Sequence, residues 1–131
     1  MRSVPYGFMV FSNQAVPQVV ELVKLGEELG FDSAWLLDSQ LVGREAFVAM
    51  TACALSTRRI RIGPGVTHTV TRHPSVIASG FASLVEVAPG RINLAIGFGD
   101  SAIRGLGGKP AKLAKYREDF EIVRRLLAGE R

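Results

Sequence analysis

Four short stretches of the sequence are rich in polar side chains or in glycine, and ligand chemistry is expected there. They are Ser12-Asn13, Asp38-Ser39, Gly65-Val66-Thr67-His68 and Gly97-Phe98-Gly99-Asp100-Ser101. Glycine lets the backbone approach a ligand closely, and the Asp38 carboxyl group is the best candidate for proton exchange with a bound ring. An equally good interpretation of Asp38 is a cap on the segment after it. Neither His68 nor His73 has a Cys, His or carboxylate residue at the spacing of a metal ligand, so we expect no metal site.

Two of these stretches carry recognisable backbone signals. Gly63-Pro64-Gly65 lies inside an apolar run, which indicates either a simple bulge or a close approach of backbone to a ligand. Gly97 to Ala102 matches the loose dinucleotide fingerprint G-x-G-x-x-G/A. A nicotinamide-binding Rossmann domain therefore stays open as an alternative. In that motif a helix begins at once, whereas here further glycines and Pro110 delay the long helix.

Alternating strands and helices must position these stretches. Apolar runs predict strands at about 4–11, 33–37, 60–67 and 92–96. Helical spacing predicts helices between Pro17 and Gly30, at 45–56, at 74–87 and from Pro110 onward. Alternation favours parallel strands joined by helical crossovers, but a doubly wound sheet and a barrel both satisfy it. In either fold the carboxyl ends of the strands share one rim, where ligands bind.

Composition restricts the class of protein. The 131 residues carry a net charge of +4 and are 47% hydrophobic, as in a globular domain. Basic residues do not interleave with aromatic ones, so we expect no nucleic-acid partner. The sequence holds no apolar run of about 20 residues and no leader-like pattern, which predicts a cytoplasmic protein without a membrane partner. The single cysteine, Cys53, excludes an intrachain disulfide.

The helices predicted at 45–56 and 74–87 are apolar in almost every direction around their axes. Such helices must be covered on all sides, although the outer helices of a barrel normally face water. A subunit interface is the economical explanation, and we expect a homo-oligomer, most simply a dimer. Glutamate at Ala49 or Phe81 should then disrupt association.

Several motifs together resemble the luciferase-like monooxygenases, in particular the branch that contains the deazaflavin-dependent methylenetetrahydromethanopterin reductases. The motifs are Gly30-Phe31-Asp32-Ser33-Ala34-Trp35, Gly63-Pro64-Gly65-Val66-Thr67, Thr71-Arg72-His73-Pro74, Ala88-Pro89-Gly90-Arg91-Ile92, Gly97-Phe98-Gly99-Asp100-Ser101-Ala102, Leu106-Gly107 and Lys109-Pro110-Ala111. They cover nearly the whole chain. The resemblance implies a TIM (β/α)8-barrel, of which residues 1–131 form a single N-terminal half-barrel domain of about four β-α units.

The resemblance also implies a function and a site. In such proteins a non-proline cis peptide in the third strand backs the coenzyme ring, and Gly65-Val66 matches that position. Asp38, Thr67 and His68 match residues near the ring, although many relatives have Asn in place of His68. Gly97, Gly99, Asp100 and Ser101 match a rim loop near coenzyme and substrate. The implied activity is hydride transfer between coenzyme F420, with FMN as the alternative, and a small-molecule substrate that the sequence does not identify.

A complete barrel of this kind has eight strands and about 250 residues, so activity is expected to need more than these four units. Two further hypotheses remain: a non-catalytic half-barrel that associates with itself, and a nicotinamide-dinucleotide-binding module.

Overall fold

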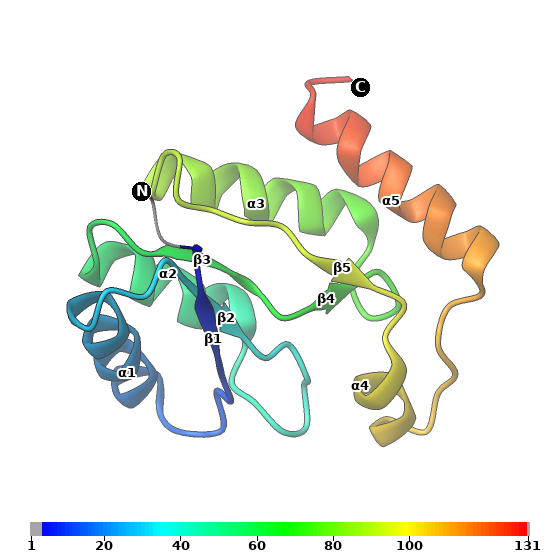
Figure 1. Ribbon diagram of the computed structural model, residues 1–131. Coiled ribbons are helices and arrows are strands. Elements are labelled where there is room, and N and C mark those ends of the chain that lie inside the picture. Colours follow the sequence, from blue (N-terminus) through cyan, green and yellow to red (C-terminus); the bar gives the residue numbers. More distant parts are fainter. Residues whose placement is uncertain (1–3, 131) are drawn as a thin grey trace.

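Strands and helices alternate along the chain, as the apolar pattern predicts (Figure 1). The computed structural model describes residues 4–130. Its strands are β1 (Gly7–Val10), β2 (Ser33–Leu36), β3 (Arg61–Pro64), β4 (Thr67–His68) and β5 (Ile96–Gly97). Its helices are α1 (Val16–Glu28), α2 (Ala46–Ser56), α3 (Pro74–Val87), α4 (Asp100–Gly105) and α5 (Leu113–Leu127).

The strands are parallel, and their order in space follows their order in the chain. β1, β2 and β3 form one sheet, in which Trp35 of β2 pairs with Met9 on one side and with Gly63 on the other. An isolated parallel β-bridge pairs Ile62 of β3 with Ile92, which precedes β5, and β4 pairs with β5 itself. The predicted fourth strand therefore lies next to the third. A doubly wound sheet reverses its strand order at a switch point, and this sheet does not. The fold is half of a (β/α)8 barrel.

The predicted third strand, 60–67, is interrupted. β3 ends at Pro64 and β4 begins at Thr67, and the peptide bond between Gly65 and Val66 is cis. The amide of Gly65 still donates to the carbonyl of Leu36 at 2.7 Å, so the first half of the strand stays attached to β2. The third strand therefore bulges at the position expected from the sequence.

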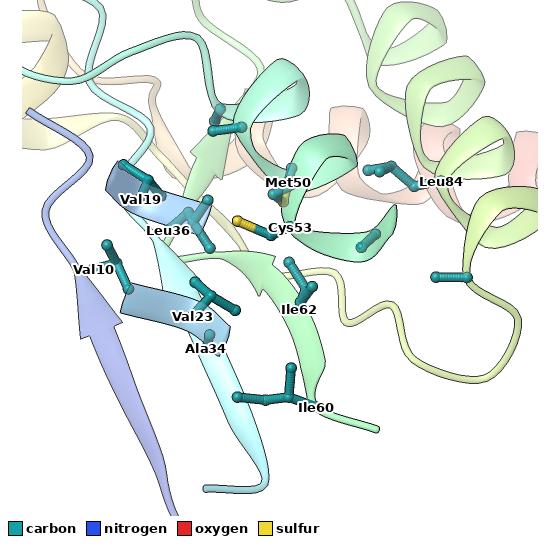
Figure 2. Packing of buried hydrophobic residues seen from close by; sticks show 14 residues of the cluster. Val10, Val19, Val23, Ala34, Leu36, Met50, Cys53, Ile60, Ile62 and Leu84 are labelled. Atoms are coloured by element: carbon teal, nitrogen blue, oxygen red, sulfur yellow. The ribbon is translucent and has the colours of Figure 1, made fainter. Parts of the chain in front are cut away.

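The two faces of the sheet differ. Residues Ala34, Leu36 and Ile62 are fully buried beneath α1 and α2, where they meet Val19 and Cys53 (Figure 2). The opposite face is the inner wall of the half-barrel, on which Met9 is 51% exposed. Trp35 lies on this wall, and a glycine in β1 and another in β3 make room for it. A Cβ at Gly7 would stand 3.2 Å from Trp35 Nε1, and one at Gly63 would stand 3.1 Å from its Cζ3.

The prediction that α2 and α3 need cover on all sides is only partly right. Much of each helix is covered within the chain, and Ala49 and Phe81 are 0% and 2% exposed. Charges at those two positions would disrupt the core, so they cannot test a subunit interface. An apolar outer surface nevertheless remains, with Val48 at 59% and Val76 at 57% exposure.

The segment between β5 and α5 differs from its prediction as a loop. Helix α4 begins directly after Gly99, whose φ of 74° only glycine adopts easily. The last helix begins at Leu113 and not at Pro110. The amide of Ala111 donates instead to the carbonyl of Phe98 at 2.9 Å, which ties this extended segment beside β5.

Candidate functional site

The carboxyl ends of the strands surround one cleft of about 240 Å³. Eight of the nine predicted coenzyme-contacting residues line it: Asp38, Gly65, Val66, His68, Gly97, Gly99, Asp100 and Ser101. The ninth, Thr67, is fully buried outside the lining, and its Oγ1 has no hydrogen-bond partner among residues 4–130. Residues from the second, third and fourth strand ends therefore meet, as parallel strand ends in a barrel must. The first strand end does not join them, because Ser12 is buried and bonds the carbonyl of Leu37 at 3.1 Å.

The bulge in the third strand shapes one wall of this cleft. Val66, just after the cis bond, is 45% exposed. A Cβ on Gly97 would approach Val66 Cγ2 to 2.8 Å, so Gly97 leaves the space that the valine side chain needs. Behind the bulge, Gly65 faces Met9 and Trp35 on the inner wall. The wall is thus an apolar side chain framed by glycines, a surface against which a flat ring can lie.

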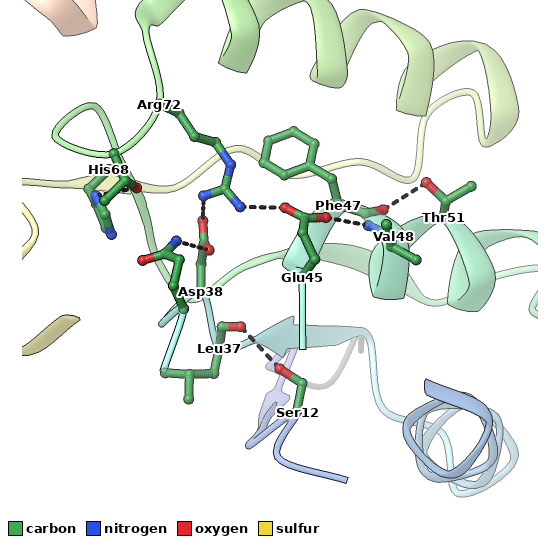
Figure 3. A network of polar contacts seen from close by, with 11 residues as sticks. Ser12, Leu37, Asp38, Glu45, Phe47, Val48, Thr51, His68 and Arg72 are labelled. Atoms are coloured by element: carbon green, nitrogen blue, oxygen red, sulfur yellow. Dashed lines mark hydrogen bonds and ion pairs between the residues drawn. The ribbon is translucent and has the colours of Figure 1, made fainter. Parts of the chain in front are cut away.

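Asp38 supplies the charge of the cleft. Its carboxylate is almost fully buried and forms an ion pair with Arg72, whose Nη1 lies 2.5 Å from Asp38 Oδ2. Gln40 Nε2 donates to the other oxygen at 3.1 Å (Figure 3). Arg72 also forms an ion pair with Glu45, the residue that caps α2 (Figure 3). Neither Arg72 nor Glu45 is among the site residues predicted from the sequence. Nothing in the linear spacing of residues 38, 45 and 72 signals that they meet.

His68 lies beside this ion pair and is 1% exposed. Its Nε2 is buried without a hydrogen-bond partner in the described part of the chain, and its Nδ1 is 3.5 Å from Thr71 Oγ1. Burial lowers the pKa of His68 below 6.5, Asp38 opposes that change and Arg72 adds to it. The imidazole is therefore neutral at pH 7. The other histidine has a structural role: His73 Nδ1 accepts the amide of Ser75 at 3.2 Å and caps α3.

The rim loop closes the far side of the cleft. Gly99 is buried against His68, whereas Asp100 and Ser101 are exposed at the start of α4. Asp100 pairs with Arg104 one turn later, at 2.5 Å. Both rim side chains therefore line the cleft at its solvent-exposed edge, and Gly99 lines its buried part.

These features fit a flat, partly polar ring. The glycines leave room for it, Val66 offers an apolar surface, and the buried, unpartnered Nε2 of His68 and the Asp38 carboxylate offer polar contacts. Within residues 4–130 no three His, Cys, Asp or Glu side chains gather closely enough to hold a metal ion. In the same residues no helix combines the length and the apolar character needed to cross a membrane.

Comparison with known proteins gives a consistent family. Residues 5–131 match the family model described as luciferase-like monooxygenase. A 5,10-methylenetetrahydromethanopterin reductase of Methanolobus tindarius is 31% identical over 128 residues, which is 96% of this chain and 39% of the relative. An F420-dependent glucose-6-phosphate dehydrogenase of Beutenbergia cavernae is 34% identical over 95% of this chain and 41% of the relative.

The fold comparison agrees. The structure of the coenzyme F420-dependent tetrahydromethanopterin reductase of Methanopyrus kandleri superposes with a TM-score of 0.84 at 26% identity, covering 95% of this chain and 40% of that one. The chain therefore spans about two fifths of the length of the relatives that it matches.

Proposed function

Because the chain belongs to the luciferase-like monooxygenase family, we propose that it forms the ring-binding part of an oxidoreductase. In that enzyme, hydride passes between coenzyme F420 and a small organic substrate. One observation carries the proposal: the bulge at Gly65-Val66, the Asp38 ion pair and the rim glycines line a single cleft at the strand ends. The F420-dependent relatives favour the deazaflavin, and FMN remains the alternative coenzyme.

The residues of the cleft bind and orient. A bound deazaflavin or flavin supplies the hydride chemistry itself. Asp38 can accept a hydrogen bond from an N–H or O–H group of the ring or substrate, and the neutral His68 can donate or accept one at Nε2. Val66 covers one side of the ring position and excludes water from it. Because Asp38 is ion-paired with Arg72, we assign it a role in orientation and not that of a proton donor.

The cleft residues bind the ring of the coenzyme and not its phosphate. Barrels of this type often bind phosphate between the loops after strands seven and eight. The four β-α units of this chain do not include those loops. Full affinity is therefore expected only when the remaining units are also present, supplied by a longer chain or by a partner.

A coenzyme titration tests the proposal. The intact protein is titrated with F420, FMN and NADH in turn, and the fluorescence of each coenzyme is followed at micromolar protein. Binding of F420 that weakens in the Asp38→Asn variant supports the proposal. Binding of FMN alone would identify FMN, and not F420, as the coenzyme. Binding of NADH alone would support the nicotinamide hypothesis instead. No response to any of the three would overturn the proposed function.

We also propose that the chain associates with a second copy through the outer surface of α2 and α3. The support is the exposure of apolar side chains on these helices, among them Val48, Leu55 and Val76. Beside them runs a groove lined by Phe47, Arg72, Val76 and Gly80, among others. Self-association without coenzyme binding is the second candidate function. A stable dimer that fails to respond to either flavin-type coenzyme would favour it.

A further inference from the structure

Arg72 occupies an unusual environment for a residue in a connecting loop. It lies between β4 and α3, yet its side chain is only 13% exposed. One end of its guanidinium pairs with Asp38 and the other with Glu45, while its Cζ atom lies over the Phe47 ring, 5.0 Å from the ring centre (Figure 3). A guanidinium can form such a two-sided contact because it is a rigid planar fork that also stacks on aromatic rings.

The second carboxylate is itself fixed. Glu45 Oε2 accepts the amide of Val48 at 2.8 Å, so the residue serves as the cap of α2. The other oxygen, Oε1, accepts a hydrogen bond from Arg72 Nη2. Through this link the position of the guanidinium depends on the first turn of a helix whose inner side is buried in the core. Arg72 therefore rests on a rigid element although its own backbone lies in a loop.

On its other side Arg72 determines what Asp38 can do in the cleft. Asp38 has two oxygens, of which Oδ2 meets Arg72 and Oδ1 meets the exposed Gln40. A glutamine amide contributes much less than a buried guanidinium to holding a carboxylate. The orientation of the Asp38 carboxylate is accordingly set by Arg72.

We propose that Arg72, anchored by Glu45 and Phe47, is a positioning residue that acts on the coenzyme ring only through Asp38. This inference rests on the proposed function, because it specifies how the same cleft is held ready for its ligand. Arg72 contacts no ring atom itself. It holds the Asp38 carboxylate in one orientation, so that a hydrogen bond from Asp38 to the ring costs no rearrangement.

A double-mutant cycle tests whether the effect passes through Asp38. F420 affinity is measured for the intact protein and for Arg72→Met, Asp38→Asn and the double variant. Loss of an outer partner typically weakens binding about tenfold, and we expect that loss for Arg72→Met. In the Asp38→Asn background the same substitution should change affinity by less than about twofold, since its route is already removed. Additive losses would overturn the proposal.

Conservative variants separate positioning from general stability. Arg72→Lys keeps the charge but, as a point charge, holds only one carboxylate well, so its affinity should lie between that of the wild type and that of Arg72→Met. If Arg72→Met does not fold, Glu45→Gln provides the same test, because it weakens the anchor at a half-exposed side chain. Arg124→Met, which removes an exposed ion pair with Glu121 on α5, is the control for loss of an arginine away from the cleft. It should bind F420 as the wild type does.

A readout without coenzyme distinguishes failure of this inference from failure of the proposed function. Arg72 lowers the pKa of His68 from a neighbouring position, so a nuclear magnetic resonance titration should show that pKa rise in Arg72→Met and stay unchanged in Arg124→Met. An unchanged His68 titration in Arg72→Met would mean that Arg72 is not held at Asp38. Failure of the wild type to bind F420 or FMN would instead contradict only the proposed function.

Discussion

Gly99 lies directly against the ring of His68, because a Cβ at position 99 would stand only 3.1 Å from His68 Cγ. It would also stand 2.7 Å from Cγ1 of Ile103 in α4. The rim loop and the third strand thus approach each other as closely as a residue without a side chain allows. Gly99 therefore combines a conformational and a steric requirement, which makes it a sensitive point of the cleft.

Gly99→Ala is expected to lower the free energy of unfolding by about 2 to 4 kcal/mol. About 1 to 2 kcal/mol comes from the left-handed backbone, and overpacking against His68 and Ile103 supplies the rest. Gly107→Ala is the matched control, because Gly107 has a similar φ of 77° and its Cβ would meet nothing within 4 Å. Chemical denaturation of both variants separates the two contributions. Equal losses would show that the contact with His68 is unimportant.

Gly97→Ala is expected to affect binding more than folding. The new methyl group would meet Val66 Cγ2 at 2.8 Å, and the half-exposed valine can yield only toward the cleft or the solvent. We expect a loss of about 1 kcal/mol in the free energy of unfolding together with weaker F420 binding. Gly105→Ala, where nothing lies within 4 Å, should leave binding unchanged. The measurements are denaturation and fluorescence titration, and unaltered F420 affinity in Gly97→Ala would contradict the assigned wall.

Glu27 should make the stability of the chain depend on pH below neutrality. Burial by itself raises the pKa of Glu27, but the amides of Ile60, Arg59 and Arg58 donate to its carboxylate and lower the pKa below 4.5 overall. A lowered folded-state pKa means that the stabilisation is present above about pH 4.5. It is lost as the pH falls through the folded-state value.

Glu27→Gln should therefore cost about 1 kcal/mol at pH 7, after allowing for its partial exposure. The difference from the wild type should shrink as the pH falls below 4. The neighbouring, exposed Glu28→Gln is the control and should show no such convergence. Thermal unfolding between pH 3 and pH 7 provides the comparison. A constant difference across that range would mean that the three amides do not depend on the charge of Glu27.

Val76→Glu is expected to abolish association of two copies. Val76 is 57% exposed on α3 and borders the groove beside Phe47, so a charge there should change the stability of the single chain by less than about 0.5 kcal/mol. Leu29→Glu, at an exposed position at the end of α1, is the control. Light scattering should report half the wild-type mass for the first variant and the wild-type mass for the second. A dimer that persists in Val76→Glu would place the interface elsewhere.

Local signals predicted much of this structure. Periodicity and the turn residues predicted each β-α unit, and glycines next to Pro64 predicted the interruption that the cis bond makes at Gly65-Val66. Parallel strands bring their carboxyl ends to one edge, so the rim residues predicted at the second, third and fourth strand ends converge without any further information.

What the sequence could not predict depends on contacts between distant segments. The ion pair of Asp38 with Arg72 joins residues 34 positions apart, and no periodic pattern records such a pairing. Helix α4 was missed because its six residues, which end in Gly105, are too few for a helical repeat to stand out. Ala49 and Phe81 were misassigned to a subunit interface for a related reason. An apolar helix face looks the same in the sequence whether its own chain or a second copy covers it.

Trp35 gives the half-barrel a built-in optical probe. It is the only tryptophan of the chain, and its indole spans the inner wall between the glycines of β1 and β3. Any segment that completes the barrel must pack over that wall, and the third-strand bulge begins beside the same residue at Gly65. The emission spectrum and lifetime of one indole therefore report, without an added label, whether the interior of the barrel is open to water or closed.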